Sequence, residues 1–515
     1  MENASISQLK QPNSEFVDLT TQYLGEHIDK TIIIFCNPIS GNKEGRIFLN
    51  IANHYLTKEK YKLIDFQYLV TEKKYEPIKA VFFELINKQD NEKGRLLVKN
   101  LTKKCKLNEE AGLPENFHKI RTLIAGGDGT ILSMVESFAK DGSDINYCCF
   151  GHVPLGTGND LSNSLGFSDH VTISENNIDE LYAILLKYYK AKYGKVDIWK
   201  MDLQMDPTVG RILVNTKKGK EPLKDDNGNI LNRYIRTFIN YISFGYDARV
   251  GYNFDPKRSF SRNVNKCIYF LEGFKKLFCQ KTISVQKFID TITVYDSEEN
   301  SINQESFFSD KDNNEIQANI STNIKNNTEI SSNNLNINKH KTKFQLMSLN
   351  KYNENNINSK CLVLEGKPCS IIFQNIINYM SGVKDIWGHG KEKLSISMKN
   401  VTNEENLKYS KKLTDMSHCE QKFDDKMLEV FTFDNGFETG LENLFGGLAK
   451  KIYHGRGPIE VKFIETPNYI KEDKENRIYL NLDGEYFHII KPIVVKIELN
   501  RDYCGGQLPF LIGNI

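Results

Sequence analysis

The chain has 515 residues, with 68 Lys and Arg against 66 Asp and Glu, so its formal net charge is only +2. This balance excludes a protein that binds nucleic acid through a large excess of positive charge, and the length allows two or three domains. The ten cysteines form no Cys-x-x-Cys pair, which argues against a zinc site or disulfide framework. No signal peptide or membrane-spanning apolar run is visible, so we expect a cytoplasmic protein with peripheral membrane contact at most.

A buried β-strand is predicted at residues 31–36, and a loop rich in small residues follows it directly. Pro38 stiffens this loop, because proline fixes one backbone angle and lacks an N–H group. Asn37, Ser40 and Gly41 are compact residues that can offer hydrogen-bond donors to a phosphate. The loop is therefore a first candidate for anion binding, although an ordinary strand-to-helix loop has the same composition.

The same strand, loop and helix pattern recurs at residues 123–135, where Leu-Ile-Ala leads into Gly-Gly-Asp-Gly-Thr. Glycines let the backbone approach an anion closely, and the helix N-terminus supplies free N–H groups. A carboxylate repels phosphate unless a metal ion lies between them, so we expect Asp128 to hold Mg²⁺. The remaining candidate phosphate-binding residues are Gly126, Gly127, Gly129 and Thr130.

A third loop of this kind, Gly-Thr-Gly-Asn-Asp, follows an apolar strand predicted at residues 147–150. Its candidate binding residues are Gly156, Thr157, Gly158, Asn159 and Asp160, although Asp160 can also be explained as a helix cap. In a doubly wound domain, loops after parallel strands gather at the carboxyl edge of the sheet. The three loops therefore predict one site, and the chain has neither a Walker A sequence nor the motifs of protein kinases.

Alternating strands and helices are predicted between the first two loops, with a strand at 63–70, a helix at 78–86 and a solvated helix or loop at 93–106. Beyond residue 190 the pattern favours antiparallel strands, including one at 238–244. We expect a doubly wound parallel-sheet α/β domain followed by a mostly antiparallel β-sandwich. The predicted segments are a polar leader at 1–29, the α/β domain at 30–190, the β-rich domain at 191–500 and a tail at 501–515.

The β-rich domain is expected to carry three polar insertions, at 206–231, 296–358 and 401–426. The second of these is rich in Asn and is expected to be disordered, because it has too little apolar surface to offset its ordering entropy. A basic and aromatic stretch at 253–282 is predicted to be helical. Lys275 and Lys276 in this stretch are candidates for contact with anionic lipid, although an ordinary amphipathic helix packed on its own domain explains the stretch equally well.

Taken in order, the motifs resemble the diacylglycerol kinases. The three loops match the catalytic domain of that family, and residues 240–248 are similar to the start of its accessory domain. Residues 375–388 resemble the family signature N-I-P-S-Y followed by W-G, with Ile377, Asn378 and Ser381 in place of the usual Pro, Ser and Gly. The zinc-containing modules that sense diacylglycerol in many eukaryotic relatives are absent, which leaves membrane recruitment open.

The resemblance implies an active site in a cleft between the two domains, where ATP and Mg²⁺ are used to phosphorylate 1,2-diacyl-sn-glycerol in a membrane. The family tripeptide Asp-Gly-Glu matches residues 483–485, which a plain hairpin turn would also explain. By resemblance, Glu485 is the first candidate for general base and Asp483 the second. Asp247 is a weaker catalytic candidate, and Trp387 is expected to pack in the core.

Three alternatives remain open at this point. A kinase for sphingoid base or ceramide shares the glycine loops, and NAD kinase shares Gly-Gly-Asp-Gly-Thr. An inactive lipid-binding relative with the same fold is the third. The signature at residues 375–388 disfavours the first alternative, the Gly-Thr-Gly-Asn-Asp loop disfavours the second, and the presence of every required loop residue disfavours the third.

Overall fold

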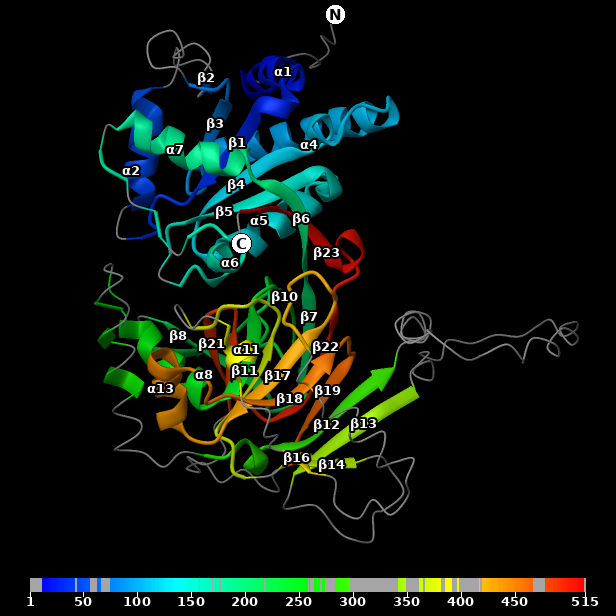
Figure 1. Ribbon diagram of the computed structural model, residues 1–515. Coiled ribbons are helices and arrows are strands. Elements are labelled where there is room, and N and C mark those ends of the chain that lie inside the picture. Colours follow the sequence, from blue (N-terminus) through cyan, green and yellow to red (C-terminus); the bar gives the residue numbers. More distant parts are fainter. Residues whose placement is uncertain are drawn as a thin grey trace, which may run out of the picture.

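The structure is a computed structural model of the full chain (Figure 1). It describes residues 12–41, 44–55, 63–65, 75–156, 158–168, 170, 171, 173–175, 177–216, 219–257, 259, 264, 265, 267, 268, 271–273, 283–296, 341–348, 361–364, 366–380, 385–390, 396, 397, 416, 419–465 and 478–513.

A seven-stranded sheet forms the centre of the first domain, in the order β2-β3-β1-β4-β5-β23-β6. Its strands are β1 (Thr31–Cys36), β2 (Leu63–Asp65), β3 (Lys79–Glu84), β4 (Ile120–Gly126), β5 (Cys148–Pro154), β6 (Lys192–Asp197) and β23 (Gln507–Ile512). The inner strands β3, β1, β4 and β5 are parallel, while β2 and β6 pair antiparallel with their neighbours. Strands β1, β4 and β5 are buried along their whole length, as expected where helices cover both faces.

Helices pack against both faces of this sheet (Figure 1). One face is covered by α1 (Pro12–Gly25), α4 (Lys88–Glu110) and α5 (Asp128–Lys140), and the other by α2 (Glu44–His54) and α7 (Ile178–Tyr189). The short α6 (Asp160–Ser164) begins immediately after the third loop. The predicted doubly wound α/β domain is confirmed.

Two predictions for this domain need correction, and a third falls partly outside the described residues. Residues 78–86 do not form a helix, because their continuous apolar run forms the buried strand β3 between β2 and β1. Such runs fit a buried strand as well as a buried helix, and periodicity alone does not separate them. The leader at 1–29 contains α1, whose Val17 and Leu24 are buried, and only residues 63–65 of the strand predicted at 63–70 are described as β2.

The second domain is a sandwich of two sheets whose facing side chains form one large apolar core. One sheet has the order β10-β7-β22-β19-β12-β13-β14-β16 and the other β18-β17-β15-β11-β20-β21-β8-β9. The strands of the first sheet are β7 (Trp199–Met205), β10 (Arg233–Phe238), β12 (Ile289–Asp296), β13 (Lys341–Ser348), β14 (Cys361–Leu364), β16 (Ile396–Ser397), β19 (Ile459–Phe463) and β22 (Pro492–Leu499). Those of the second are β8 (Arg211–Thr216), β9 (Gly219–Pro222), β11 (Tyr241–Gly245), β15 (Ser370–Gln374), β17 (Leu428–Phe433), β18 (Lys450–Gly455), β20 (Ile478–Leu482) and β21 (Glu485–Ile490).

The helices of this domain are α8 (Tyr246–Phe254), α11 (Ile386–His389) and α13 (Gly436–Phe445). None of the helices in the described ranges is long and apolar enough to cross a membrane. The helical stretch predicted at 253–282 is only partly described, and Lys275 and Lys276 lie outside the described residues.

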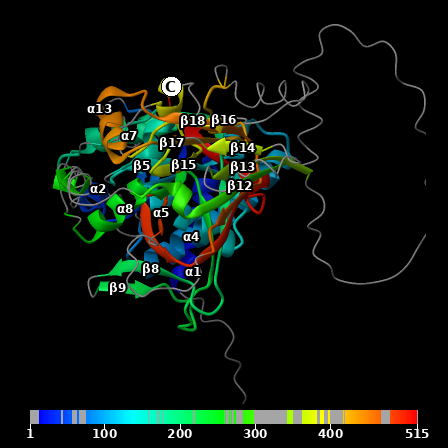
Figure 2. The same ribbon diagram turned by 90° about the horizontal axis from the view of Figure 1, so that it is seen from below.

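For the β-rich domain, the structure refines the prediction for one insertion and contradicts two other predictions. The insertion at 206–231 contains β8 and β9, which form a hairpin that projects from the domain (Figure 2). Residues 341–348 of the Asn-rich insertion form β13, which pairs with β12. The single strand predicted at 238–244 is two strands in different sheets, because β10 ends at Phe238 and β11 begins at Tyr241.

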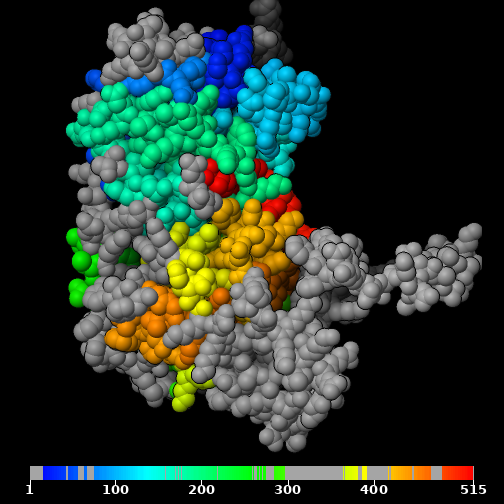
Figure 3. All heavy atoms as spheres, viewed as in Figure 1, coloured from blue at the N-terminus to red at the C-terminus, as the bar shows by residue number. Residues whose placement is uncertain are grey.

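The tail predicted at 501–515 contains β23, which lies in the sheet of the first domain between β5 and β6. The chain therefore crosses from the first domain to the second after β6 and returns after β22. In Figure 3 the red C-terminal segment lies among the cyan and green atoms of the first domain, next to the orange atoms of the second. Both crossings join the domains close to the predicted site.

Candidate active site

The three predicted loops contact one another at the carboxyl edge of the parallel strands. The Leu155 N–H donates to the Gly126 carbonyl oxygen at 3.0 Å, which connects the third loop with the second. Gly41 has φ +61°, and a Cβ atom at this position would lie 2.1 Å from the Leu155 carbonyl oxygen. A Cβ atom on Gly156 would lie 2.6 Å from the Gly127 Cα atom. Glycine is thus required for this packing, and the prediction that the loops share one edge is confirmed.

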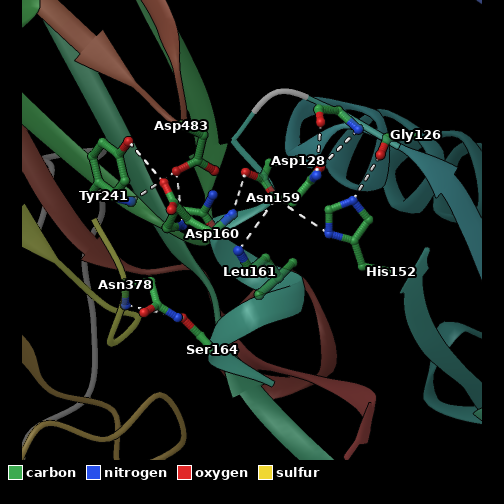
Figure 4. A network of polar contacts seen from close by, with 12 residues as sticks. Gly126, Asp128, His152, Asn159, Asp160, Leu161, Ser164, Tyr241, Asn378 and Asp483 are labelled. Carbon is green, nitrogen blue, oxygen red and sulfur yellow. Dashed lines mark hydrogen bonds and ion pairs between the residues drawn. The ribbon is translucent and has the colours of Figure 1, made fainter. Parts of the chain in front are cut away.

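Asp128 is the first residue of α5 and connects the second loop with the third (Figure 4). Its Oδ2 atom accepts a hydrogen bond from the Asp160 N–H at 3.1 Å, and its Oδ1 atom accepts one from the Leu161 N–H at 3.4 Å. Burial raises the pKa of Asp128 to about 6, although these N–H donors act in the opposite direction. The carboxyl group is therefore held at a helix N-terminus with a pKa near the physiological range.

His152 lies directly behind Asp128 on the otherwise apolar strand β5. Its Nε2 atom is 3.1 Å from the Gly126 carbonyl oxygen, and its Nδ1 atom is 3.4 Å from Asp128 Oδ1. Complete burial lowers the pKa of His152 to about 4, which makes the imidazole neutral at physiological pH. The carbonyl oxygen can only accept, so the proton is on Nε2 and Nδ1 faces Asp128 as a lone pair. His152 is not among the residues expected from the sequence, although a histidine in an apolar strand is a visible signal.

The second domain adds Asp483 to the site from the turn between β20 and β21. Its Oδ2 atom accepts the Ile239 N–H at 2.8 Å, and its Oδ1 atom accepts the Asn240 and Tyr241 N–H groups at 2.9 and 3.0 Å. Burial raises the pKa of Asp483 to about 7, with a further contribution from repulsion by Asp128. Both oxygens of this carboxyl group are therefore engaged with the backbone that connects β10 to β11.

Glu485 lies two residues after Asp483, and its side chain lies next to α5. Residues 483 and 484 form a two-residue hairpin turn with positive φ at both positions, so the tripeptide also has the turn that was its alternative explanation. A Cβ atom placed on Gly129 would lie 3.8 Å from Glu485 Oε1, so the carboxylate is next to the first turn of α5. On its other side, Glu485 Oε2 is 3.8 Å from Nη2 of Arg236, a residue of β10. Arg236 was not identified from the sequence.

Hydrogen bonds between the domains hold the third loop and α6 against the β-rich domain (Figure 4). The Ser164 hydroxyl accepts from the Asn378 backbone N–H at 3.1 Å and from its Nδ2 group at 2.9 Å. The Tyr241 hydroxyl lies 3.5 Å from Asp160 Oδ2. The position where the family usually has Ser thus carries a longer side chain, and this side chain reaches across the domain boundary.

Comparison with known proteins matches two family models in the order that the motifs predicted. The diacylglycerol kinase catalytic domain matches residues 31–184, and the diacylglycerol kinase accessory domain matches residues 237–486. The chain belongs to the diacylglycerol kinase family. The catalytic-domain match contains all three glycine loops, and the accessory-domain match contains Asp483 and Glu485.

Individual family members are similar at modest identity. The chain is 27% identical to diacylglycerol kinase 7 of Arabidopsis thaliana over 243 residues and 28% identical to diacylglycerol kinase 3 of the same plant over 244 residues. Each match spans 44% of this chain and 44% of the relative. Diacylglycerol kinase zeta of Rattus norvegicus is 27% identical over 186 residues, which are 34% of this chain and 18% of the relative.

Asp247 lies in a different place from the other predicted carboxylates of this family member. It is 1% exposed, and its side chain accepts hydrogen bonds from the hydroxyl groups of Ser243 and Tyr379. These partners belong to the β-rich domain, and no hydrogen bond among the described residues joins Asp247 to the glycine loops. Thr157 of the third loop lies outside the described residues.

The signature at 375–388 has a structural role at the domain boundary. Asn375 donates from Nδ2 to the carbonyl oxygens of Asp197 and Ile239, and its Oδ1 accepts from the Trp199 indole N–H. Trp387 is 1% exposed and packs in a core cluster, as expected. Asn375 thus fixes the chain where it crosses between domains.

The carboxylates of the site fit a magnesium ion that arrives with a nucleotide. Among the described residues, no three His, Cys, Asp or Glu side chains are grouped to hold a metal ion by themselves. Magnesium in phosphoryl-transfer sites needs only one or two protein carboxylates, because phosphate and water supply the other ligands. Asp128, the first residue of α5, meets this requirement.

Proposed function

We propose that this chain transfers the γ-phosphate of ATP to the hydroxyl group of 1,2-diacyl-sn-glycerol, giving phosphatidic acid and ADP. The observation that supports the proposal is the convergence of three glycine loops on the N-terminus of α5, with Glu485 approaching from the accessory domain. A helix N-terminus with close backbone approach is suited to phosphate. The accessory domain supplies the second wall of the site, so the acceptor lipid would enter from that side.

Each group has a distinct role in this proposal. Asn37, Ser40 and Gly41, with the N–H groups at the start of α5, would bind nucleotide phosphates. Asp128 would hold Mg²⁺, directly or through water, and the ion would neutralise phosphate charge during transfer. Thr157 and its neighbours in the third loop would complete the nucleotide site.

Glu485 is the proposed proton acceptor for the lipid hydroxyl group. Its side chain is 50% exposed and lies next to the first turn of α5, where a substrate can reach it. Asp483 is less suited to this role, because three backbone N–H groups occupy its oxygens. We therefore propose that Asp483 positions the backbone of residues 239–241 and that Glu485 takes the proton.

Transfer of labelled γ-phosphate from ATP tests the reaction. The acceptors are dioleoylglycerol in mixed micelles, and sphingosine and NAD in parallel reactions, with the Asp128→Ala variant as the control. Label in phosphatidic acid that is absent with Asp128→Ala supports the proposal. Label in sphingosine phosphate or NADP alone would overturn the substrate while keeping the phosphoryl transfer.

A further inference from the structure

Negative side chains dominate the site where the two domains meet. Asp128, Asp160, Asp483 and Glu485 all lie at this boundary, and the proposed nucleotide would add a triphosphate. Like charges at short range raise the energy of the complex unless a cation compensates them. Arg236 is a cation that the described structure places beside Glu485, within electrostatic reach of Asp483 and of Glu136 on α5.

The guanidinium group of Arg236 is not fully used by the protein. Its Nε atom is buried and has no hydrogen-bond partner among the described residues. Its ion pair with Glu485 is loose, because the closest distance is 3.8 Å and Glu485 is 50% exposed. Exposed pairs of this kind contribute little to stability, whereas an unsatisfied buried donor is unfavourable. The protein thus retains a charged donor with unused hydrogen-bonding capacity.

Arg233, three residues earlier on the same strand, shows a structural arginine for comparison. Its Nε and Nη2 atoms donate to the two carboxylate oxygens of Asp202 at 2.8 and 2.6 Å. Side chains alternate between the two faces of a strand, so Arg233 and Arg236 point to opposite faces of β10. The guanidinium group of Arg233 pairs with Asp202 on the solvent-facing side of the strand, while Arg236 faces the site.

The carboxylate of Glu485 shows that negative charge is accommodated in this part of the site. It lies next to the first turn of α5, where N–H groups attract anions, and next to the Arg236 guanidinium group. A phosphoryl group has the same requirements as this carboxylate. Since Glu485 is the proposed proton acceptor, the attacked phosphorus atom must lie close to it, and therefore close to Arg236.

We propose that Arg236 binds the γ-phosphate of ATP and stabilises the phosphoryl group while it is transferred. This inference rests on the proposed function. The bond between the γ-phosphorus and the β,γ-bridging oxygen breaks, the lipid oxygen bonds to the γ-phosphorus, and Glu485 takes the hydroxyl proton. Arg236 stays protonated throughout and compensates the charge on the non-bridging oxygens, as arginines do in other phosphoryl transfers.

Equilibrium binding of Mg-ATP and Mg-ADP to the full chain, without lipid, tests this proposal. We expect Arg236→Gln to weaken ATP binding by about 10- to 100-fold, the range for one charge-assisted contact, with ADP binding changed less than about 2-fold. Arg233→Gln is the matched control and should leave both affinities unchanged. Arg236→Lys keeps the positive charge but loses the planar guanidinium group, so its affinity for ATP should lie between those of the wild type and Arg236→Gln.

The outcomes separate this proposal from the proposed function. If the wild-type chain binds ATP and Arg236→Gln binds it equally well, Arg236 has no role at the γ-phosphate and the kinase proposal stands. Equal weakening of ATP and ADP would also overturn the γ-phosphate assignment. A wild-type chain that binds neither nucleotide would overturn both proposals. If Arg236→Gln does not fold, the ATP-to-ADP affinity ratio of Arg236→Lys decides, and an unchanged ratio would overturn the assignment.

Discussion

Replacing Asp483 with Ala should destabilise the protein strongly, because the carboxyl group satisfies three backbone N–H groups at once. Its oxygens accept hydrogen bonds from the N–H groups of Ile239, Asn240 and Tyr241 at 2.8 to 3.0 Å. Because these three residues are buried, water cannot fully replace the carboxylate as their acceptor. A buried donor left unpaired costs about 1–3 kcal/mol. With partial entry of water, three donors correspond to roughly 3–6 kcal/mol, which is a large part of the 5–15 kcal/mol typical of folded domains.

Asp483→Asn is the informative partner variant. Its single carbonyl oxygen can still accept the two N–H groups at 2.9 and 3.0 Å, so it loses one acceptor interaction and should cost about 1–3 kcal/mol. Urea unfolding at pH 8, above the pKa of about 7 for Asp483, keeps the wild-type carboxyl group ionised. The fluorescence of Trp199 and Trp387, the two tryptophans of the chain, reports unfolding of the β-rich domain.

An Asp483→Ala variant whose free energy of unfolding lies within about 1 kcal/mol of the wild-type value would contradict this prediction. An Asp483→Asn variant that is less stable than Asp483→Ala would also contradict it. In that case the three hydrogen bonds would not hold the connection between β10 and β11. Asp483 would then be available as an alternative proton acceptor, and Glu485→Gln would retain phosphoryl transfer.

Three further predictions concern stability and the insertion. Burial raises the pKa of Asp197 to about 7, so the contribution of this residue to stability is full below about pH 4 and is lost as the pH rises through 7. The melting temperature should therefore fall from pH 5 to pH 8. This fall should be smaller in the Asp197→Asn variant. Ser164→Ala leaves two donors of Asn378 without their acceptor, and urea unfolding should show a loss of about 1–3 kcal/mol. Deletion of residues 300–340 should preserve phosphoryl transfer and melting temperature, whereas a deletion that extends through β13 should lower the melting temperature, because β13 pairs with β12.

The sequence was sufficient to predict the order of domains and the shared position of the loops. Each loop combines a buried strand, glycines and a helix start within about fifteen residues, and such local patterns are readable from one sequence. The hairpin at residues 483–485 was also visible, because positive φ at two turn positions favours Asp-Gly. What failed was the choice between strand and helix for residues 78–86, where the apolar run has no decisive period.

Other features depend on contacts between distant parts of the chain. Arg236 and Glu485 are brought together by a sheet arrangement that their separate motifs do not specify. His152 meets Asp128 because β4 and β5 are neighbours in register, with His152 opposite Ile124. The short strand β23 gives no local sign that its partners are β5 and β6, more than 300 residues earlier. These contacts are set by topology, which single-sequence periodicity does not encode.

The position of β23 has a consequence for how the protein is made. The ribosome releases β1 to β6 first, then the whole β-rich domain at residues 199–499, and only afterwards residues 507–512. Until then the edge of β5 lacks its neighbour, and β6 lacks the strand with which it pairs. Since β5 leads into the third loop, the first domain is completed only after the β-rich domain has been synthesised. A nascent chain that is still on the ribosome at residue 499 thus has an incomplete first domain, and premature release there yields a chain with an open sheet edge that is prone to aggregation.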